Sequence, residues 1–319
     1  MARPSLRRLS LALLPLLLGA CALKTVDITE DQFLRGRKSD WVSDRITRSN
    51  LELALPDLPG QSLKGWRLSH PAPKATLIYF YGGGNNLWDN ARLMHELAQK
   101  LEVDVVSFDV RGTGASGGQT RFETMRADAL RIYDQQRKPG QPTLVLGYSL
   151  GSVAAVHLAA NRPVEGLMVA AGISSFDEAR GHFDKLVPWY AKPFVELKFD
   201  PAFLQRPQPV DEMPKVQAPT LVMHGEADET LPVQCGDSLA QASKAPWKRY
   251  LRIPAKGHGN LPLVSGEGLE ALRALVASGS AQRHRGGALI QPRPTRSRPA
   301  PSRPCSGRCR SSRGCWRRA

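Results

Sequence analysis

The stretch "TLVLGYSLGSVAA", residues 143–155, decides how the rest of the chain is interpreted. Its first residues are apolar, as in a buried strand, and its last residues have the small side chains of a tightly packed helix. Between them lies G-Y-S-L-G, residues 147–151, where glycines two positions before and after the serine permit a sharp turn. Such a turn lifts the hydroxyl of Ser149 above the sheet edge at a helix N-terminus, where developing negative charge is stabilised. Ser149 is therefore the candidate nucleophile.

Outward from this turn, strand and helix patterns alternate. After two short strands in 50–73, apolar strand patterns lie at 75–84, 103–110, 142–147, 164–172, 218–225 and 248–257, and helical patterns at 90–101, 121–137, 149–162, 235–244 and 268–278. This order predicts an α/β fold with a mostly parallel central sheet and helices on both faces. Residues 176–214 break the alternation with prolines and aromatic residues, so we expect a short cap insertion there. Its aromatic side chains either fasten the cap or line a pocket.

A serine nucleophile needs a base, and the base needs an orienting carboxylate. His258 follows the last predicted strand between two glycines, where a flexible loop can bring an imidazole over the sheet edge. The other histidines lie in predicted helices, at strand ends or in the tail, and we interpret them as structural or solvated. Asp228 follows the preceding strand and is the candidate acid, with Glu226 as the fallback.

In this Ser…Asp…His order the chain resembles the α/β-hydrolase superfamily, closest to its monoglyceride-lipase-like and serine-aminopeptidase-like branch, over residues 51–277. The strings "YFYGGGN", "FDVRGTGASGG", "GYSLG", "HGEADETLP" and "GHGN" carry the resemblance. It implies the α/β-hydrolase fold and an oxyanion hole made by the backbone N–H groups of Gly83 and Leu150. One departure is Tyr81-Gly82, where the family commonly has His-Gly, so the packing beneath the hole is expected to differ.

The glycines of "FDVRGTGASGG" also match the G-x-G-x-x-G spacing of dinucleotide-binding loops. In those loops the motif belongs to the first strand–helix unit and opens directly into a helix. Here several strands precede it, and "GQTRFET" separates it from the next helix. The α/β-hydrolase resemblance accounts for the segment as D-x-R-G-x-G-x-S, residues 109–116, so we expect no nucleotide cofactor.

Residues 1–20 have the pattern of an export signal. Residues 1–20 have a basic start, a leucine-rich run and small residues before Cys21, and Leu18-Gly19-Ala20-Cys21 resembles the lipobox of bacterial lipoproteins. That resemblance implies cleavage before Cys21, lipidation of its sulfur, a tether over 21–50, and a place in the bacterial cell envelope, with Ala22 favouring the outer membrane. The alternative is an ordinary signal peptide cut after Ala20.

The net charge of +15 is concentrated at the chain ends. Residues 280–319 hold eleven arginines and no acidic residue, and Arg3, Arg7 and Arg8 supply three more charges, so the middle is nearly neutral. We therefore expect no nucleic-acid partner for the folded domain. Residues 278–319 have the composition of a disordered tail, and the spacing of its three cysteines does not predict a metal site.

Together these features predict a membrane-anchored serine hydrolase that cleaves a carboxylic ester of a lipid or other acyl substrate and needs no cofactor. A thioesterase or serine peptidase would use the same three residues. A non-catalytic lipoprotein that uses the fold for binding or scaffolding is the alternative from another class. The oligomeric state is not predicted.

Overall fold

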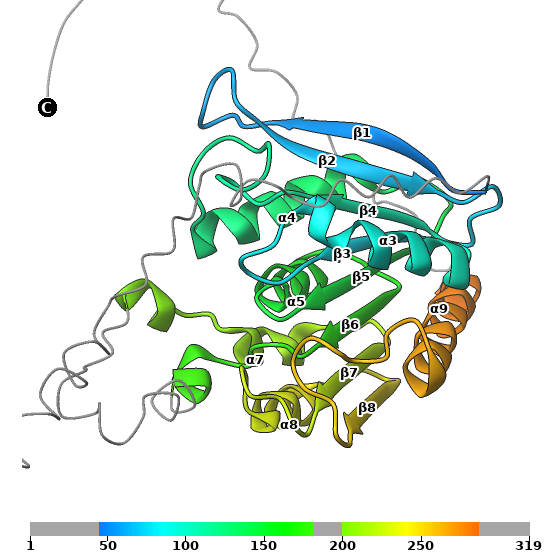
Figure 1. Cartoon of the computed structure of the whole chain (residues 1–319). Coiled ribbons are helices and arrows are strands. Elements are labelled where there is room, and N and C mark those ends of the chain that lie inside the picture. Colours follow the sequence, from blue (N-terminus) through cyan, green and yellow to red (C-terminus); the bar gives the residue numbers. More distant parts are fainter. Residues whose placement is uncertain (1–44, 181–199, 287–319) are drawn as a thin grey trace, which may run out of the picture.

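The computed structural model describes residues 45–180 and 200–286 of the 319-residue chain. Within these ranges eight strands form one sheet in the order β1-β2-β4-β3-β5-β6-β7-β8 (Figure 1). The strands are β1 Thr47–Ala54, β2 Ser62–Ser69, β3 Thr76–Phe80, β4 Asp104–Phe108, β5 Thr143–Tyr148, β6 Gly166–Ala170, β7 Thr220–Gly225 and β8 Lys248–Ile253. Only the pairings β1–β2 and β2–β4 are antiparallel. The predicted α/β-hydrolase fold is confirmed.

Helices cover both faces of the sheet (Figure 1). The helices are α3 Leu87–Leu101, α4 Phe122–Gln136, α5 Gly151–Asn161, α7 Pro209–Glu212, α8 Val233–Ala242 and α9 Gly266–Gly286, with short 3₁₀ turns η1 Pro201–Leu204 and η2 Met213–Lys215. On α3, Leu87, Ala91, Met94 and Leu101 recur at helical spacing and pack with α9 against one face. Helices α4, α5 and α8 contribute to the core on the other face. The central strands are buried on both sides, which explains their continuous apolar runs.

The common direction of the parallel strands determines where the candidate site lies. Strands β3 to β8 all run in one direction, so the loops after them emerge at one edge of the sheet. These loops carry residues 81–86, 149–150, 226–232 and 254–265. Side chains far apart in the sequence can therefore meet at this edge.

Ordered elements extend past both limits expected for the domain, 51–277. Strand β1 begins at Thr47, and its first four residues are exposed at the sheet edge, so they lack the apolar pattern that would mark a strand. Helix α9 continues to Gly286, so the first nine residues of the expected disordered tail, 278–286, are helical. The extended part of the helix packs closely against the chain before β6 at Gly279. A Cβ at residue 279 would lie 2.3 Å from the Glu165 carbonyl oxygen, so only glycine permits this contact.

The expected cap, 176–214, is described in part, and its residues 181–199 lie outside the described ranges. Phe176 and Phe203 pack with Phe122 of α4, with ring centroids 4.9 to 5.1 Å apart, and we call these three residues the aromatic cluster. At the other end, Met213 is fully buried in the core beside α5 and α8. The C-terminal end of the expected cap therefore belongs to the main core of the fold.

Among the described residues, no helix combines the length and the apolar character that crossing a bilayer requires. The expected signal peptide 1–20, Cys21 and most of the expected tether 21–50 lie outside the described residues.

Candidate active site

Ser149 occupies the tip of a strained turn between β5 and α5. Its φ is +52°, in the left-handed region that non-glycine residues rarely adopt, and its N–H donates to the Ala170 carbonyl oxygen of β6 at 2.9 Å. A Cβ at Gly147 would lie 2.6 Å from the Ala155 side chain, and one at Gly151 would lie 2.0 Å from the Phe80 carbonyl oxygen. The two glycines are therefore required by close packing against α5 and β3, and the turn presents Ser149 at the carboxyl edge.

The structure brings the three predicted side chains together. His258 Nε2 lies 2.9 Å from Ser149 Oγ, and His258 Nδ1 lies 2.8 Å from Asp228 Oδ2. Glu226, the alternative candidate for the acid, is exposed and pairs with Arg252 at 3.4 Å. Asp228 is therefore the carboxylate that contacts His258. A hydroxyl, an imidazole and a carboxylate in this sequence can transfer a proton away from the serine.

Asp228 is held as a buried carboxylate. Its Oδ1 accepts the N–H groups of Thr230 at 2.9 Å and Leu231 at 2.8 Å. Burial alone would raise its pKa, but hydrogen bonds from His224, His258 and the Leu231 N–H outweigh burial and hold the pKa of Asp228 well below its usual value. The group facing the imidazole is therefore ionised at neutral pH.

The loop that carries His258 is anchored at several points. The Tyr148 hydroxyl donates to the His258 carbonyl oxygen, and the two rings pack edge to face with centroids 6.0 Å apart. The Gly257 N–H donates to Asn260 Oδ1 at 2.7 Å, which closes the loop on itself. Burial, helped by the charge of Asp228, raises the pKa of Tyr148 to about 12, so this hydroxyl keeps its proton. Tyr148 directly precedes the candidate nucleophile, but no pattern in the sequence indicates this role.

The two expected oxyanion-hole residues, Gly83 and Leu150, lie against each other, and Leu150 directly follows Ser149 in the chain. A Cβ at Gly82 would lie 3.3 Å from the Ser149 Cβ, and one at Gly83 would lie 3.1 Å from the Leu150 side chain, so the glycine loop after β3 passes directly over the nucleophile turn. Within the described residues, the N–H groups of Gly83 and Leu150 donate no hydrogen bond. The expected role of these two groups, donation to an oxygen bound beside Ser149, thus meets no competing partner in the described ranges.

Asp109 explains both the Tyr81 departure and the glycine motif. Its buried carboxylate accepts the Tyr81 hydroxyl at 2.8 Å, the Leu87 N–H at 2.9 Å and the Ala115 N–H at 3.3 Å. Gly114 has φ +53°, and a Cβ there would lie 2.0 Å from Asp109 Oδ2. The glycine loop therefore wraps a carboxylate of the protein itself, which would repel a phosphate. Through Tyr81 and Leu87, Asp109 fixes both ends of the loop over Ser149.

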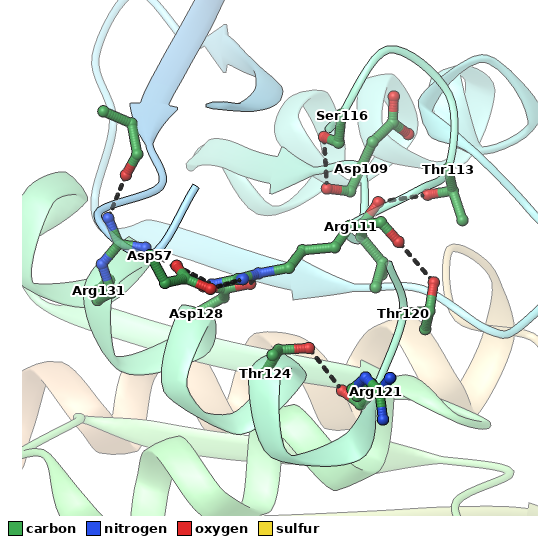
Figure 2. Close-up of polar contacts among 12 residues, drawn as sticks. Asp57, Asp109, Arg111, Thr113, Ser116, Thr120, Arg121, Thr124, Asp128 and Arg131 are labelled. Atoms are coloured by element: carbon green, nitrogen blue, oxygen red, sulfur yellow. Dashed lines mark hydrogen bonds and ion pairs between the residues drawn. The ribbon is translucent and has the colours of Figure 1, made fainter. Parts of the chain in front are cut away.

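Arg111 ties the same segment to the rest of the fold (Figure 2). Its guanidinium, 5% exposed, forms two hydrogen bonds with Asp128 of α4, at 2.6 and 2.8 Å, and two with Asp57 of the β1–β2 turn, at 2.5 and 3.1 Å. Figure 2 shows the extended side chain reaching both carboxylates. Hydrogen bonding to these two partners raises the pKa of Arg111 further, so its guanidinium keeps its charge.

The comparisons with known proteins agree with this fold. A family model described as "alpha/beta hydrolase fold" matches residues 75–208, a range that includes the Ser149 turn and ends before Asp228. An uncharacterized protein of Mycobacterium tuberculosis is 28% identical over 228 residues, which is 68% of this chain and 75% of that protein. The lysophosphatidylserine lipase ABHD12 of Danio rerio is 27% identical over 55% of this chain and 48% of its own length.

Among solved structures, the Pyrococcus furiosus esterase Pf2001 superimposes with a TM-score of 0.56 at 17% identity, over 73% of this chain and 92% of the esterase. This likeness shows the shared fold. Together with the family model, it agrees with the α/β-hydrolase fold seen in the strand order.

Proposed function

We propose that this chain, which has the α/β-hydrolase fold, is a serine hydrolase that cleaves a carboxylic ester through Ser149, His258 and Asp228. The observation that carries the proposal is the unbroken series of contacts from hydroxyl to imidazole to carboxylate, at 2.9 and 2.8 Å. A binding or scaffolding protein has no need of this arrangement, nor of a nucleophile on a strained turn.

In the proposed reaction, Ser149 Oγ attacks the ester carbonyl carbon while its proton passes to His258 Nε2. The oxygen that becomes negative accepts hydrogen bonds from the Gly83 and Leu150 N–H groups. The alcohol then leaves with the proton from Nε2, and an acyl group remains on Ser149. A water molecule attacks this acyl group, gives its proton to Nε2, and the acid leaves as that proton returns to Oγ. Asp228 accepts the Nδ1–H throughout and stabilises the imidazolium.

The side chains beside the nucleophile favour an apolar acyl group. Leu150, Ile173, Phe176 and Leu231 belong to one apolar cluster next to the turn, and Phe176 continues it into the aromatic cluster. A relative named as a lysophosphatidylserine lipase is consistent with a lipid ester. A panel of p-nitrophenyl esters of increasing chain length, with thioester and amide counterparts, tests this assignment on protein lacking residues 1–21. Turnover confined to thioesters or amides would replace the esterase proposal by one of those activities.

The membrane anchor is part of the same proposal and is supported only by the lipobox-like sequence that ends at Cys21. Mass spectrometry of the mature N-terminus tests it, with Cys21→Ser as the comparison. A lipid-modified Cys21 supports an anchor, whereas an unmodified N-terminus at Cys21 indicates an ordinary signal peptide.

The catalytic assignment is tested with a fluorophosphonate probe, which labels activated serines. Ser149→Ala is expected to abolish both labelling and ester turnover while circular dichroism stays unchanged. Ser238→Ala is the matched control, because Ser238 lies on α8 and contacts Glu178 rather than the site, and it should label normally. Persistent labelling of Ser149→Ala would assign the nucleophile elsewhere.

A further inference from the structure

His224 is a second histidine beside the candidate acid. It lies on β7, is fully buried, and its Nε2 is 3.3 Å from Asp228 Oδ2 and 3.2 Å from the Leu231 carbonyl oxygen. Its Nδ1 is buried and has no hydrogen-bond partner in the part of the chain that the structure describes. The sequence analysis interpreted this residue as structural or solvated.

The contacts fix how this imidazole is protonated. Both neighbours of Nε2 are acceptors, so Nε2 carries the proton; it donates to the Leu231 carbonyl oxygen at 3.2 Å, and its N–H also lies beside Asp228 Oδ2 at 3.3 Å. The unpartnered Nδ1 is then the deprotonated nitrogen of a neutral ring, because a second buried N–H without an acceptor would be costly. Near the point where α8 approaches His224 lies the Tyr250 hydroxyl of β8, whose pKa is raised above its ordinary value by burial and by Asp237.

Helix α8 packs closely against the base of the His224 side chain. A Cβ at Gly236 of α8 would lie 2.7 Å from the His224 Cβ and 2.7 Å from the Tyr250 hydroxyl, so the helix can approach only because residue 236 is glycine. Asp228 Oδ2 consequently faces two histidines, His258 at 2.8 Å and His224 at 3.3 Å, while its Oδ1 is held by two backbone N–H groups.

We propose that His224 is a positioning residue for the Ser149–His258–Asp228 arrangement, which makes this inference rest on the proposed function. Its Nε2–H occupies one side of Asp228 Oδ2 and leaves the other side to His258, so the carboxylate has one orientation. The same hydrogen bond withdraws negative charge from Oδ2. His258 is therefore held in line with Ser149 without being over-stabilised as the imidazolium.

Two variants separate the hydrogen bond from the shape of the ring. His224→Phe keeps a ring of similar size and removes the donor, whereas His224→Gln places an N–H near the position of Nε2. With the donor lost, Asp228 stabilises protonated His258 more strongly, and the midpoint of the His258 titration should rise by about half a pH unit, the size expected for a long, shared hydrogen bond to a charged group. His224→Gln should restore the wild-type midpoint.

The midpoint is measured by NMR of the histidine side chains across pH, which requires no catalysis, and the acidic limb of kcat/KM against pH should move with it. The value of kcat should fall roughly tenfold in His224→Phe with little change in KM, because the base is less well oriented. His95→Phe on α3 is the matched control, since His95 also has a buried, unpartnered Nε2 but lies on another element, and its His258 midpoint should be unchanged.

A folded His224→Phe protein with an unchanged His258 midpoint would overturn the inference. A shifted midpoint in a protein without ester turnover would instead support the role of His224 and count against the proposed function. If His224→Phe does not fold, the smaller His224→Ala takes its place, since it also removes the donor: a raised His258 midpoint supports the positioning role, and an unchanged midpoint overturns it.

Discussion

Removing the Asp109 carboxylate should cost far more stability than removing the Tyr81 hydroxyl that it binds. Both residues are 4% exposed, and the carboxylate accepts two short hydrogen bonds, from the Tyr81 hydroxyl and the Leu87 N–H. A hydrogen bond to a charged group contributes about 1.5–3 kcal/mol, so Asp109→Ala should lower the free energy of unfolding by about 4 kcal/mol and leave two buried donors unsatisfied. Tyr81→Phe removes one donor and leaves the Leu87 contact intact, so it should cost about 1.5 kcal/mol.

Urea denaturation of the two single variants and the double variant gives both costs and their coupling. Because the two side chains are in direct contact, the double variant should cost about 1.5 kcal/mol less than the sum of the single changes. Fluorophosphonate labelling of Ser149 should be slowed much more by Asp109→Ala, since the loop over the nucleophile then loses both of its attachments. Asp134→Ala, at an exposed ion pair with Arg162, is the control and should cost about 0.5 kcal/mol or less. Equal costs for Asp109→Ala and Tyr81→Phe would refute the reasoning.

Three further outcomes are expected. Arg111→Ala should lower the free energy of unfolding by about 3 kcal/mol, because it leaves the Asp128 carboxylate, 7% exposed, without its main partner. Asp57→Ala should lower it much less, since the Asp57 carboxylate is 55% exposed. Equal losses in the two variants would argue against the buried Arg111–Asp128 pair as the source of the stability. Tyr148→Phe should lower kcat/KM roughly tenfold with little loss of stability, because the base loses its anchor at the backbone carbonyl; unchanged kinetics would contradict this. The lowered pKa of Asp228 means that ionised Asp228 stabilises the fold above its unfolded pKa of about 4, and that this contribution is lost as the pH falls further. The unfolding free energies of wild type and Asp228→Asn should therefore begin to converge below about pH 4 in urea titrations and keep converging as the pH falls toward the lowered pKa of the folded state, and a gap that stays constant would count against the assignment.

The elements that sequence patterns predict well are those whose signal is local. The strand, turn and helix around Ser149 have their apolar run, their glycines and their small residues in consecutive positions. The candidate acid and base were found because parallel strands deliver their following loops to one edge. The strand order and the convergence of the loops follow from general rules of α/β folds.

The parts that were missed depend on contacts between distant residues. The role of Asp109 depends on Tyr81, 28 positions away, and no spacing in the sequence indicates that pairing. His224 looked like an ordinary strand residue because its importance comes from the direction of one ring nitrogen. The start of β1 was missed because its first residues are polar and exposed, so hydropathy could not distinguish them from a loop.

The contact between Ser149 and His258 spans 109 positions of the chain, and His258 follows the last strand of the sheet. During translation, Ser149 emerges long before His258, and in the described part of the chain no other imidazole is in contact with its hydroxyl. If the proposed function holds, a nascent or truncated chain that ends before β8 should therefore be inert toward esters however well its first strands have formed. Labelling of Ser149 by a probe should thus require a complete sheet, and the labelled fraction should measure how many molecules contain one.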